Sequence, residues 1–370
     1  MELTKHQLIA AQLLTKITEL GHSVTYIPQV SEGPIVTIYR FLPRGATRVS
    51  HIEGLAQDFA ICLGVEDVLV KRIPGESAVS IWVPNKERHY IDFKETMGAY
   101  WKAREGQKIP LNLGVDHLGR PVVVDLSSLP HLLIAGATGS GKSTLLSSIL
   151  ASIVYGVNSS DVQIILSDTK GVEFGRFIGA PHLLYDPATT VYTTLERLEW
   201  LNQEMDRRYE ILKKQGVQNL AQYNERTSKR IPYYLLCIDE LADVIQDDTK
   251  VGDEGKGPTL GNLALRKIGK LAQKARAVGI HIIAGTQRPS AKLISGDIKS
   301  NFPARLSFRL PSGVDSRVVL DTEGAEHLIQ QGDMLFINPN KPGIQRLHSP
   351  YIKNEEDIEA AIEVACRRQS

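Results

Sequence analysis

A glycine-rich segment with one lysine and one serine carries the strongest chemical signal in the sequence. Residues 136–143 read Gly-Ala-Thr-Gly-Ser-Gly-Lys-Ser, the pattern of a phosphate-binding loop, G-x-x-x-x-G-K-S/T. In such a loop, backbone N–H groups and a helix N-terminus attract anions, the lysine reaches the β- and γ-phosphates, and the serine hydroxyl can ligate Mg²⁺. The segment therefore predicts binding of ATP or GTP. The residues expected to hold the nucleotide are Gly136, Ala137, Thr138, Gly139, Ser140, Gly141, Lys142, Ser143 and Thr144.

The flanks of this loop have the pattern that the loop requires. The run His131 to Ala135 is short and apolar, as a buried parallel strand should be. Apolar residues recur at helical spacing from Ser143 to Ile153. A chance glycine-rich turn lacks this context, so we expect a strand, the loop and a helix in that order.

Two adjacent carboxylates follow a second apolar run. Tyr233 to Ile238 directly precedes Asp239 and Glu240. A strand there would carry both acids to the C-terminal edge of a parallel sheet, where ligands bind in such folds. We expect Asp239, with Ser143, to hold Mg²⁺ and Glu240 to polarise the attacking water. Adjacent acids are often merely solvated, but the nearby phosphate loop favours the functional interpretation.

Two further segments offer groups for the γ-phosphate. Thr286 and Gln287 follow the apolar run His281 to Ala284, so either is a candidate sensor, and a simple polar turn is the alternative. Lys274 and Arg276 lie close to the expected end of a helix. An arginine from a neighbouring subunit can stabilise the transition state of hydrolysis. A cation that complements the helix dipole is the alternative at this position.

Composition bounds the class of protein. A chain of 370 residues exceeds the usual size of one domain, so two domains are expected. The formal net charge of +1 excludes a global basic field, and any contact with nucleic acid must be local. The three cysteines match no metal-ligand spacing and give no support for a disulfide scaffold. No apolar run approaches the roughly 18 residues of a membrane span, which predicts a soluble, cytoplasmic chain without direct membrane insertion.

Hydrophobic periodicity divides the chain near residue 105. Residues 1–105 predict a small α+β domain, with helices over 3–20 and 50–63 and short strands between turns. Strands and helices alternate in residues 106–370, which is typical of a parallel sheet covered on both faces. The glycine-rich segment 247–261 predicts a surface loop. The elements expected in the second part are strands over 132–135, 162–167, 233–238, 281–285 and 305–309 and a long helix over 189–215.

Basic residues are in local excess between positions 288 and 317, which contain six basic and two acidic residues. In a ring of subunits, such a segment could line a pore and follow a phosphate backbone without reading bases. An ordinary basic surface is the alternative. Few aromatic residues lie here, so contact with a duplex backbone is favoured over base stacking. The basic residues are Arg288, Lys292, Lys299, Arg305, Arg309 and Arg317.

Taken together, these segments resemble the motor of the FtsK/SpoIIIE DNA translocases. In the amino-terminal part, Gly33 to Tyr39, Ile73 to Gly75 and Val83 to Asn85 are similar to the α subdomain of that family. The resemblance covers nearly the whole chain. In the second part it rests on residues 130–143, 204–209, 238–243, 271–281, 285–289, 298–305, 315–317 and 331–335.

The resemblance implies an α/β, RecA-like P-loop NTPase domain with a parallel sheet core, preceded by the small α+β domain. It further implies a homo-hexameric ring that uses ATP and Mg²⁺ to pump double-stranded DNA. By this analogy Gln287 serves the nucleotide, Arg276 acts on the site of a neighbouring subunit, and Arg288 and Arg317 face DNA. Gly313 departs from the family, where a basic residue is expected, and the loop 247–261 is expected to be an insertion.

Two other functions use the same nucleotide site. One is a protein-secretion or coupling ATPase, and the other is a DNA-clamping assembly ATPase that lacks processive translocation. The α-like amino-terminal domain favours the DNA translocase. The sequence has no counterpart of the winged-helix subdomain or membrane-spanning segment of the septum motors, so orientation on DNA is expected to come from a membrane or DNA-loading partner.

Overall fold

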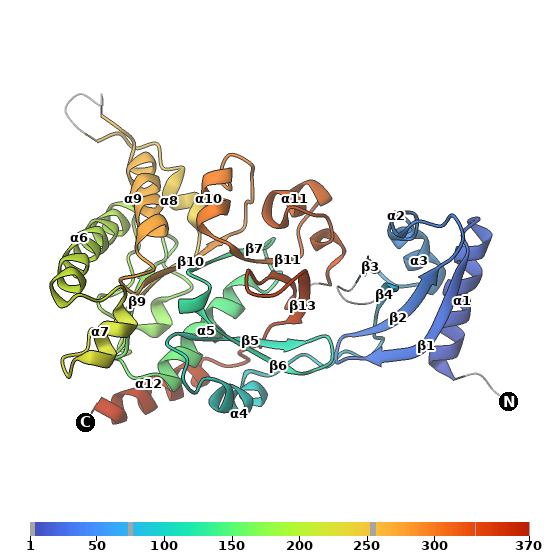
Figure 1. The fold of residues 1–370 in the computed structure, drawn as a ribbon, viewed down its shortest axis with the longest axis horizontal. Helices are drawn as coiled ribbons and strands as arrows, with labels where there is room; N and C mark the ends of the chain where they lie inside the picture. Colours follow the sequence, from blue (N-terminus) through green and yellow to red (C-terminus); the bar gives the residue numbers. More distant parts are fainter. Residues whose placement is uncertain (1–3, 73–76, 252–256, 330, 370) are drawn as a thin grey trace.

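The computed structural model describes residues 4–72, 77–251, 257–329 and 331–369, which form two adjoining domains (Figure 1). The small domain contains an antiparallel sheet with the strand order β1-β2-β4-β3. Three helices cover one face of this sheet, with Leu13, Phe59 and Ile81 in the shared core. Its elements are α1 (Lys5–Glu19), β1 (Val24–Glu32), β2 (Val36–Pro43), α2 (Val49–Glu53), α3 (Ala56–Leu63), β3 (Leu69–Arg72) and β4 (Val79–Pro84).

Two details of this part differ from the sequence-based expectation. The helix expected over 50–63 is interrupted, because Gly54 ends α2 and Leu55 precedes the first turn of α3. A helix that was not among the expected elements, α4 (Phe93–Ala103), follows the small sheet, and its first turn is capped by the Asp92 carboxylate, which accepts the Lys94 N–H at 2.8 Å. All three residues of the expected motif at 73–75 lie outside the described part of the chain.

A nine-stranded mixed sheet forms the centre of the larger domain, with the strand order β6-β5-β13-β12-β11-β7-β10-β9-β8. The five expected strands are all present within one residue of their predicted bounds, and they form the parallel part of the sheet. The expectation of an α/β fold is confirmed. The strands are β5 (Pro110–Asp116), β6 (Pro121–Asp125), β7 (His131–Ala135), β8 (Val162–Ser167), β9 (Tyr233–Ile238), β10 (Ile280–Thr286), β11 (Ala304–Phe308), β12 (Asp333–Ile337) and β13 (Ile344–His348).

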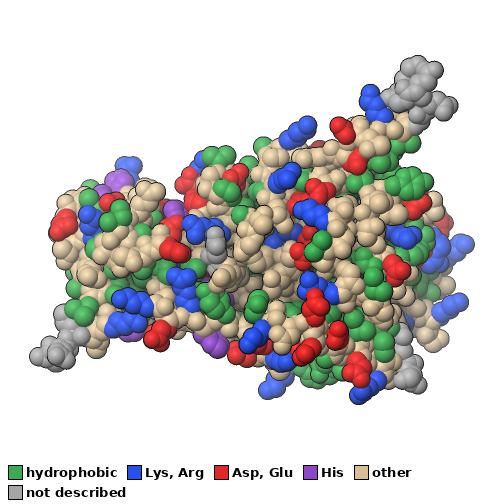
Figure 2. Space-filling model, turned by 180° about the vertical axis from the view of Figure 1, so that it is seen from behind, with side chains coloured by type: hydrophobic (Ala, Val, Ile, Leu, Met, Phe, Trp, Pro, Cys, Tyr) green, Lys and Arg blue, Asp and Glu red, His purple; other side chains and the backbone are tan. Residues whose placement is uncertain are grey.

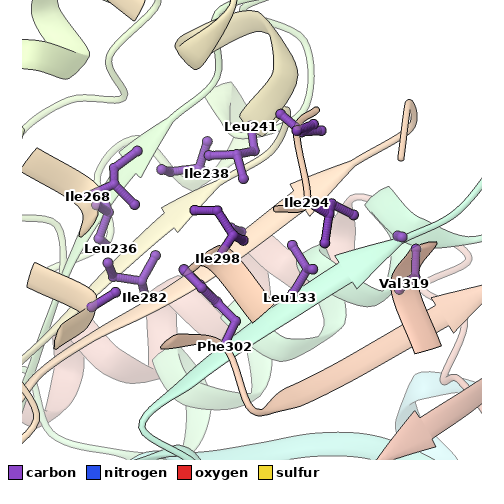
Figure 3. Packing of buried hydrophobic residues seen from close by; sticks show 14 of the residues in the cluster. Leu133, Leu236, Ile238, Leu241, Ile268, Ile282, Ile294, Ile298, Phe302 and Val319 are labelled. Atoms are coloured by element: carbon purple, nitrogen blue, oxygen red, sulfur yellow. The ribbon is translucent and has the colours of Figure 1, made fainter. Parts of the chain in front are cut away.

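Helices cover both faces of this sheet. On one face, α4, α5 and α12 pack on a core that includes Leu146 and Ile358, and α8 to α11 lie across the other face (Figure 1). Figure 3 shows Leu236 and Ile282 of the sheet against Ile268 and Ile298 of these helices. Each such side chain contributes roughly 1.5–3 kcal/mol on burial. The helices are α5 (Lys142–Gly156), α6 (Val191–Gln215), α7 (Leu220–Arg226), α8 (Leu241–Ile245), α9 (Leu260–Lys274), α10 (Gly296–Asn301), α11 (Gly313–Leu320) and α12 (Glu356–Gln369), with 3-10 turns η1 (Leu126–Ser128), η2 (Gly175–Phe177) and η4 (Ala325–His327).

The second face of the small sheet packs on the larger domain. Leu69 and Trp82 belong to the same buried cluster as Leu335 of β12. Beside them, His327 of η4 and Asp67 form a hydrogen bond of 2.9 Å, and this bond raises the pKa of His327. The two domains are therefore joined by a mixed apolar and charged interface.

We propose a domain boundary between residues 85 and 92 rather than near residue 105. This position is supported by α4, which packs against β5, β6 and α5 of the larger domain. In the segment 247–261, Lys250 and Thr259 form an isolated bridge, and residues 252–256 lie outside the described chain. None of the helices within the described ranges is long and apolar enough to cross a bilayer.

A buried charge cluster anchors the long helix α6. Arg208 is fully buried, donates to Glu204 Oε1 at 2.7 Å and to the backbone oxygen of Val278 at 2.8 Å, and lies over the ring of Tyr234. Burial alone raises the pKa of Glu204, but hydrogen bonds from Arg207 and Arg208 outweigh this effect and hold its pKa below the ordinary value. The cluster ties α6 to the segment that enters β10.

Replacing Glu204 with Ala should destabilise the protein by about 3–5 kcal/mol, because Arg208 then keeps a buried charge without its partner. The measurement is the free energy of unfolding in urea. Glu199→Ala on the same helix removes an exposed pair with Lys267 and should cost less than about 1 kcal/mol. Equal losses in the two variants would contradict this account. The effect of Glu204→Ala should shrink as the pH falls through the lowered pKa of Glu204, since the protonated wild type loses the same pair.

Candidate nucleotide-binding site

The phosphate loop lies between the ends of three parallel strands. After β7, the Gly136 N–H donates to Thr286 O at 3.2 Å, and the Ala137 N–H donates to Arg309 O at 3.0 Å. A Cβ atom at Gly136 would lie 2.5 Å from Ser140 Oγ and 2.8 Å from a Phe308 carbon. Only glycine fits there, so the close packing of the loop on β10 and β11 depends on it.

Free backbone donors line the start of α5. The first backbone bond of this helix runs from the Leu145 N–H to Gly141 O at 2.9 Å. Within the described chain, no acceptor is found for the N–H groups of Gly139, Gly141, Lys142 and Ser143. Such a set of amides at a helix N-terminus has the positive potential that a phosphate group requires.

The Lys142 ammonium group is held at the end of β9. Its Nζ donates to Asp239 Oδ1 and to the backbone oxygen of Asp239, both at 2.6 Å, and the two side chains are 2% and 3% exposed. Gly285 of β10 makes room for this contact, because a Cβ there would lie 2.4 Å from Asp239 O and 3.2 Å from Lys142 Nζ. The structure thus brings together the lysine of the loop and the first acid of the pair.

Glu240 and Gln287 meet beside this contact. Glu240 Oε2 accepts the Gln287 N–H at 2.8 Å, and Oε1 accepts the Ala242 N–H at 3.3 Å as the cap of α8. The Gln287 side chain accepts a hydrogen bond from Thr138 Oγ1 at 2.9 Å. Of the two sensor candidates, Gln287 lines the cavity, while Thr286 is buried and its hydroxyl accepts the Arg288 N–H.

A cavity of about 510 Å³ opens over the loop. Its volume lies within the usual range of small-molecule sites. The loop residues 137–139 and 141–144 form one wall, and Ile35, Tyr90, Ile91 and Tyr351 add apolar and aromatic surface. Sequence reasoning missed this second wall, because it comes from the small domain, the linker and the end of the sheet, and no local pattern marked it.

Backbone pairing fixes the second wall. The Phe93 N–H donates to Tyr351 O at 2.9 Å, and the Tyr351 N–H donates to Ile91 O at 2.8 Å. Gly332 supports the loop from the same side, because its N–H donates to Ser140 O at 3.0 Å. The motif at 331–335 gave a signal for this contact, since it was among the segments that carried the family resemblance.

A turn after β8 brings a further carboxylate to the cavity. The buried Asp168 accepts four backbone N–H groups, from Lys170, Gly171, Glu173 and Phe174, at 2.7–3.2 Å. This turn places Glu173 on the cavity wall. The sequence gave no indication of Glu173, because the turn is organised by a single buried side chain.

Arg276 and His281 both lie away from the cavity. Arg276 is exposed and lies just before β10, at the sheet edge opposite to the phosphate loop, so it does not reach the nucleotide site of its own chain. His281 lies at that same edge, its Nδ1–H donates to Pro130 O at 2.7 Å, and burial lowers its pKa to about 4. His281 is therefore a neutral side chain packed inside the protein.

The basic segment is partly neutralised in the structure. Lys299 and Arg305 both pair with Asp321, and Arg317 pairs with Glu323. Both acids follow residue 317 in the chain and fold back onto the segment 288–317. The excess of positive charge there is therefore smaller than the sequence of that segment alone indicates. On the face of the molecule drawn in Figure 2, Lys and Arg side chains are interspersed with Asp and Glu side chains. Three of the six cations have no ion pair within the described ranges, namely Arg288, Lys292 and Arg309.

Comparison with known proteins gives this arrangement a family. The model of the FtsK/SpoIIIE family matches residues 94–291, and the model of the FtsK alpha domain matches residues 3–85. The chain belongs to the FtsK/SpoIIIE family. It is 35% identical to the DNA translocase FtsK of Rickettsia typhi over 94% of its own length and 50% of that relative. It is 37% identical to the DNA translocase FtsK of Helicobacter pylori over 88% of its own length and 38% of that relative.

The chain thus spans half or less of the length of these curated FtsK relatives. Among solved structures, the pCW3 conjugation coupling protein TcpA, in monomer form with ATPγS, superposes with a TM-score of 0.68 over 98% of this chain and 99% of that chain at 22% identity. The cytoplasmic domain of the type VII secretion ATPase EccC of Thermomonospora curvata gives a TM-score of 0.62 over 76% of this chain and 34% of that chain at 21% identity. These two likenesses are of fold, and they confirm a P-loop ATPase fold.

The residues present fit a nucleotide with Mg²⁺. The free amides of the loop match a phosphate chain, and Lys142 supplies the cation. Within the described ranges there is no cluster of three or more His, Cys, Asp or Glu side chains suited to a metal. Mg²⁺ at NTPase sites is usually held by one or two protein oxygens together with phosphate and water, and the side-chain oxygens of Ser143 and Asp239 are of the kind that Mg²⁺ binds.

Replacing Gly285 with Ala should weaken both the fold and nucleotide binding, because the new methyl group would overlap Asp239 O and crowd Lys142 Nζ. The expected loss of stability is about 1–3 kcal/mol, the usual cost of overpacking. Gly269→Ala in α9 is the matched control, since a Cβ there meets open space. This control should stabilise the helix by about 0.5–1 kcal/mol. Thermal unfolding and titration with ATPγS measure both effects, and unchanged ATPγS affinity in Gly285→Ala would contradict the assignment.

Proposed function

We propose that this chain is the motor part of an ATP-driven translocase of double-stranded DNA that works as a homo-hexameric ring. The observation that carries the proposal is the contact of Lys142 with Asp239 beside Glu240 and Gln287, in a chain of the FtsK/SpoIIIE family. The name of its curated relatives, DNA translocase FtsK, supports DNA as the substrate. The α-like domain that accompanies the motor supports the same function.

In this proposal the phosphate chain of ATP binds the free amides of Gly139, Gly141, Lys142 and Ser143. Lys142 exchanges its contact with Asp239 for the β- and γ-phosphates, which leaves Asp239 Oδ1 free to face Mg²⁺ together with Ser143. Mg²⁺, when bound, neutralises charge on the phosphates during transfer. Glu240 orients and polarises the attacking water, after releasing the Gln287 N–H.

Gln287 is the proposed γ-phosphate sensor, because it contacts Thr138 on the loop and Glu240 at the sheet edge. The exposed Arg288 follows it directly and is the proposed DNA contact. Arg317 can take the same role only by leaving Glu323. An exposed ion pair stabilises a protein by less than about 1 kcal/mol, so the pair with Glu323 does not prevent Arg317 from contacting DNA. The cytoplasmic location stays a prediction.

ATP hydrolysis in the presence and absence of long duplex DNA tests the proposal. Lys142→Ala should abolish turnover, while Glu240→Gln should still bind ATP and lower the rate by roughly 10²–10⁴-fold. Glu199→Gln, an exposed residue of α6, should leave the rate unchanged. Displacement of a triplex-forming strand from the duplex measures translocation.

Each outcome of this assay separates the candidate functions. Duplex-stimulated hydrolysis with strand displacement supports a translocase. Stimulation without displacement would instead identify a DNA clamp. Hydrolysis at the same rate with and without DNA would contradict the DNA translocase and favour a secretion or coupling ATPase. For that alternative, the similarity to EccC supports only the fold.

Arg276 is the proposed trans-acting arginine, because it cannot reach the cavity of its own chain. Arg276→Ala should lower hydrolysis by roughly 10³-fold or more. Mixing this variant with Lys142→Ala subunits should restore part of the activity, since each supplies what the other lacks. Lys274→Ala is the matched control from the same helix end and should remain active alone. If Lys274→Ala were instead inactive alone and regained activity on mixing, while Arg276→Ala did not, the trans-acting role would belong to Lys274.

A further inference from the structure

A second cavity, of about 450 Å³, lies at the sheet edge opposite to the phosphate loop. The helix α5 connects the two places, because it begins at Lys142 and reaches this cavity at Gly156. Fifteen helical residues span about 22 Å, so the second cavity is separate from the nucleotide site. The ends of α4 and α12 and the helix α7 form its other walls, with Trp101, Arg368 and Asn224 among the lining residues.

The second cavity carries an excess of positive charge. Four cations line it, namely Arg104, Lys108, Arg230 and Arg368, against the carboxylates Asp161 and Glu225. Within the described ranges, neither Lys108 nor Arg230 has an ion-pair partner for its side chain. The larger domain thus holds a concave site with two more positive than negative groups.

Two of these arginines are held in place by their neighbours. The guanidinium carbon of Arg104 lies 3.8 Å above the ring of Trp101, and Arg368 Nη1 donates to Tyr155 O at 2.6 Å. A stacked guanidinium keeps its N–H edge free for a planar anion. Holding these long side chains in one position lowers the entropic cost of binding.

Polar atoms in the wall lack partners. Arg104 Nε and Gln107 Oε1 are both buried, and neither has a hydrogen-bond partner in the described structure. A buried unsatisfied polar group costs about 1–3 kcal/mol, so such groups call for a ligand or ordered water. Both residues line the cavity together with the half-exposed ring of Trp101.

We propose that this cavity binds a small phosphate ester that carries a planar ring, such as a nucleoside monophosphate. Arginine forks bind phosphate oxygens in a bidentate manner, and the part of Trp101 that remains exposed beside Arg104 supplies a surface for the ring. The volume suits a small molecule. A DNA duplex presents its phosphates on a convex surface and cannot enter a cavity of this size. The site is independent of the proposed motor function and performs no hydrolysis.

Trp101 provides the readout. In a Lys142→Ala background, which disables the first site, AMP should change the tryptophan fluorescence in a saturable manner. Inorganic phosphate should bind more weakly than AMP, because it lacks the ring. Trp101→Phe should remove the fluorescence response. Calorimetry should still detect AMP binding in that variant, with reduced affinity.

Charge variants test the walls. Arg104→Ala and Arg230→Ala should each weaken AMP binding by roughly tenfold, the usual effect of losing one charged hydrogen bond. Arg230 is exposed, so its replacement leaves the fold intact. Lys102→Ala removes a cation from α4 outside the cavity and should change the affinity less than twofold, about 0.4 kcal/mol.

Three results would overturn the proposal. One is the absence of saturable AMP binding tighter than about 1 mM by both fluorescence and calorimetry. The second is an equal loss of affinity in Lys102→Ala and Arg230→Ala. The third is a Trp101 response to a short DNA duplex but not to AMP, which would assign the cavity to a nucleic-acid backbone. Loss of DNA-stimulated hydrolysis alone would leave this proposal intact, since the assay uses a background without turnover.

Discussion

The buried contact between Lys142 and Asp239 is the interaction on which the arrangement of the larger domain depends. Removing two charges from water carries a cost that a single ion pair often fails to repay, so such a pair contributes little net stability. Its geometry is nevertheless closely determined. Lys142 must open α5 after β7, Asp239 must end β9, and Gly285 of the strand between them must lack a side chain. Under the proposed function, an arriving phosphate replaces Asp239 as the partner of an ammonium group that is already desolvated.

The strand order explains how groups from distant parts of the chain meet at this contact. β10 lies between β7 and β9, so its end at Thr286 is next to both the phosphate loop and the two acids. The parallel direction brings all three strand ends to one edge, where ligands bind in open α/β sheets. The antiparallel extension through β12 and β13 then carries the chain to Tyr351, whose backbone pairs with the linker at Ile91. The nucleotide cavity therefore has walls from both domains.

Much of this site could be predicted from the sequence because its signals are local. The loop 136–143, the apolar runs of the parallel strands and the acids after β9 each depend on neighbouring residues only. The wall formed by Tyr90 and Tyr351 could not be predicted, since it arises from pairing between segments about 260 residues apart. The neutralisation of Arg317 by Glu323 was missed for a related reason, because a charge count over a window ignores acids that fold back onto it.

The end of β10 has a special position in the proposed motor. Over three consecutive residues, Thr286 O accepts the N–H of the loop residue Gly136, the Gln287 N–H binds Glu240, and Arg288 is exposed. Glu240 Oε2 accepts this N–H, so a change in the backbone at Gln287 alters the hydrogen bonding of the carboxylate. That backbone also carries Arg288, hence a shift that frees the carboxylate must move the adjacent cation. Hydrolysis and the grip on DNA would then be coupled through one peptide unit, without a longer pathway between them.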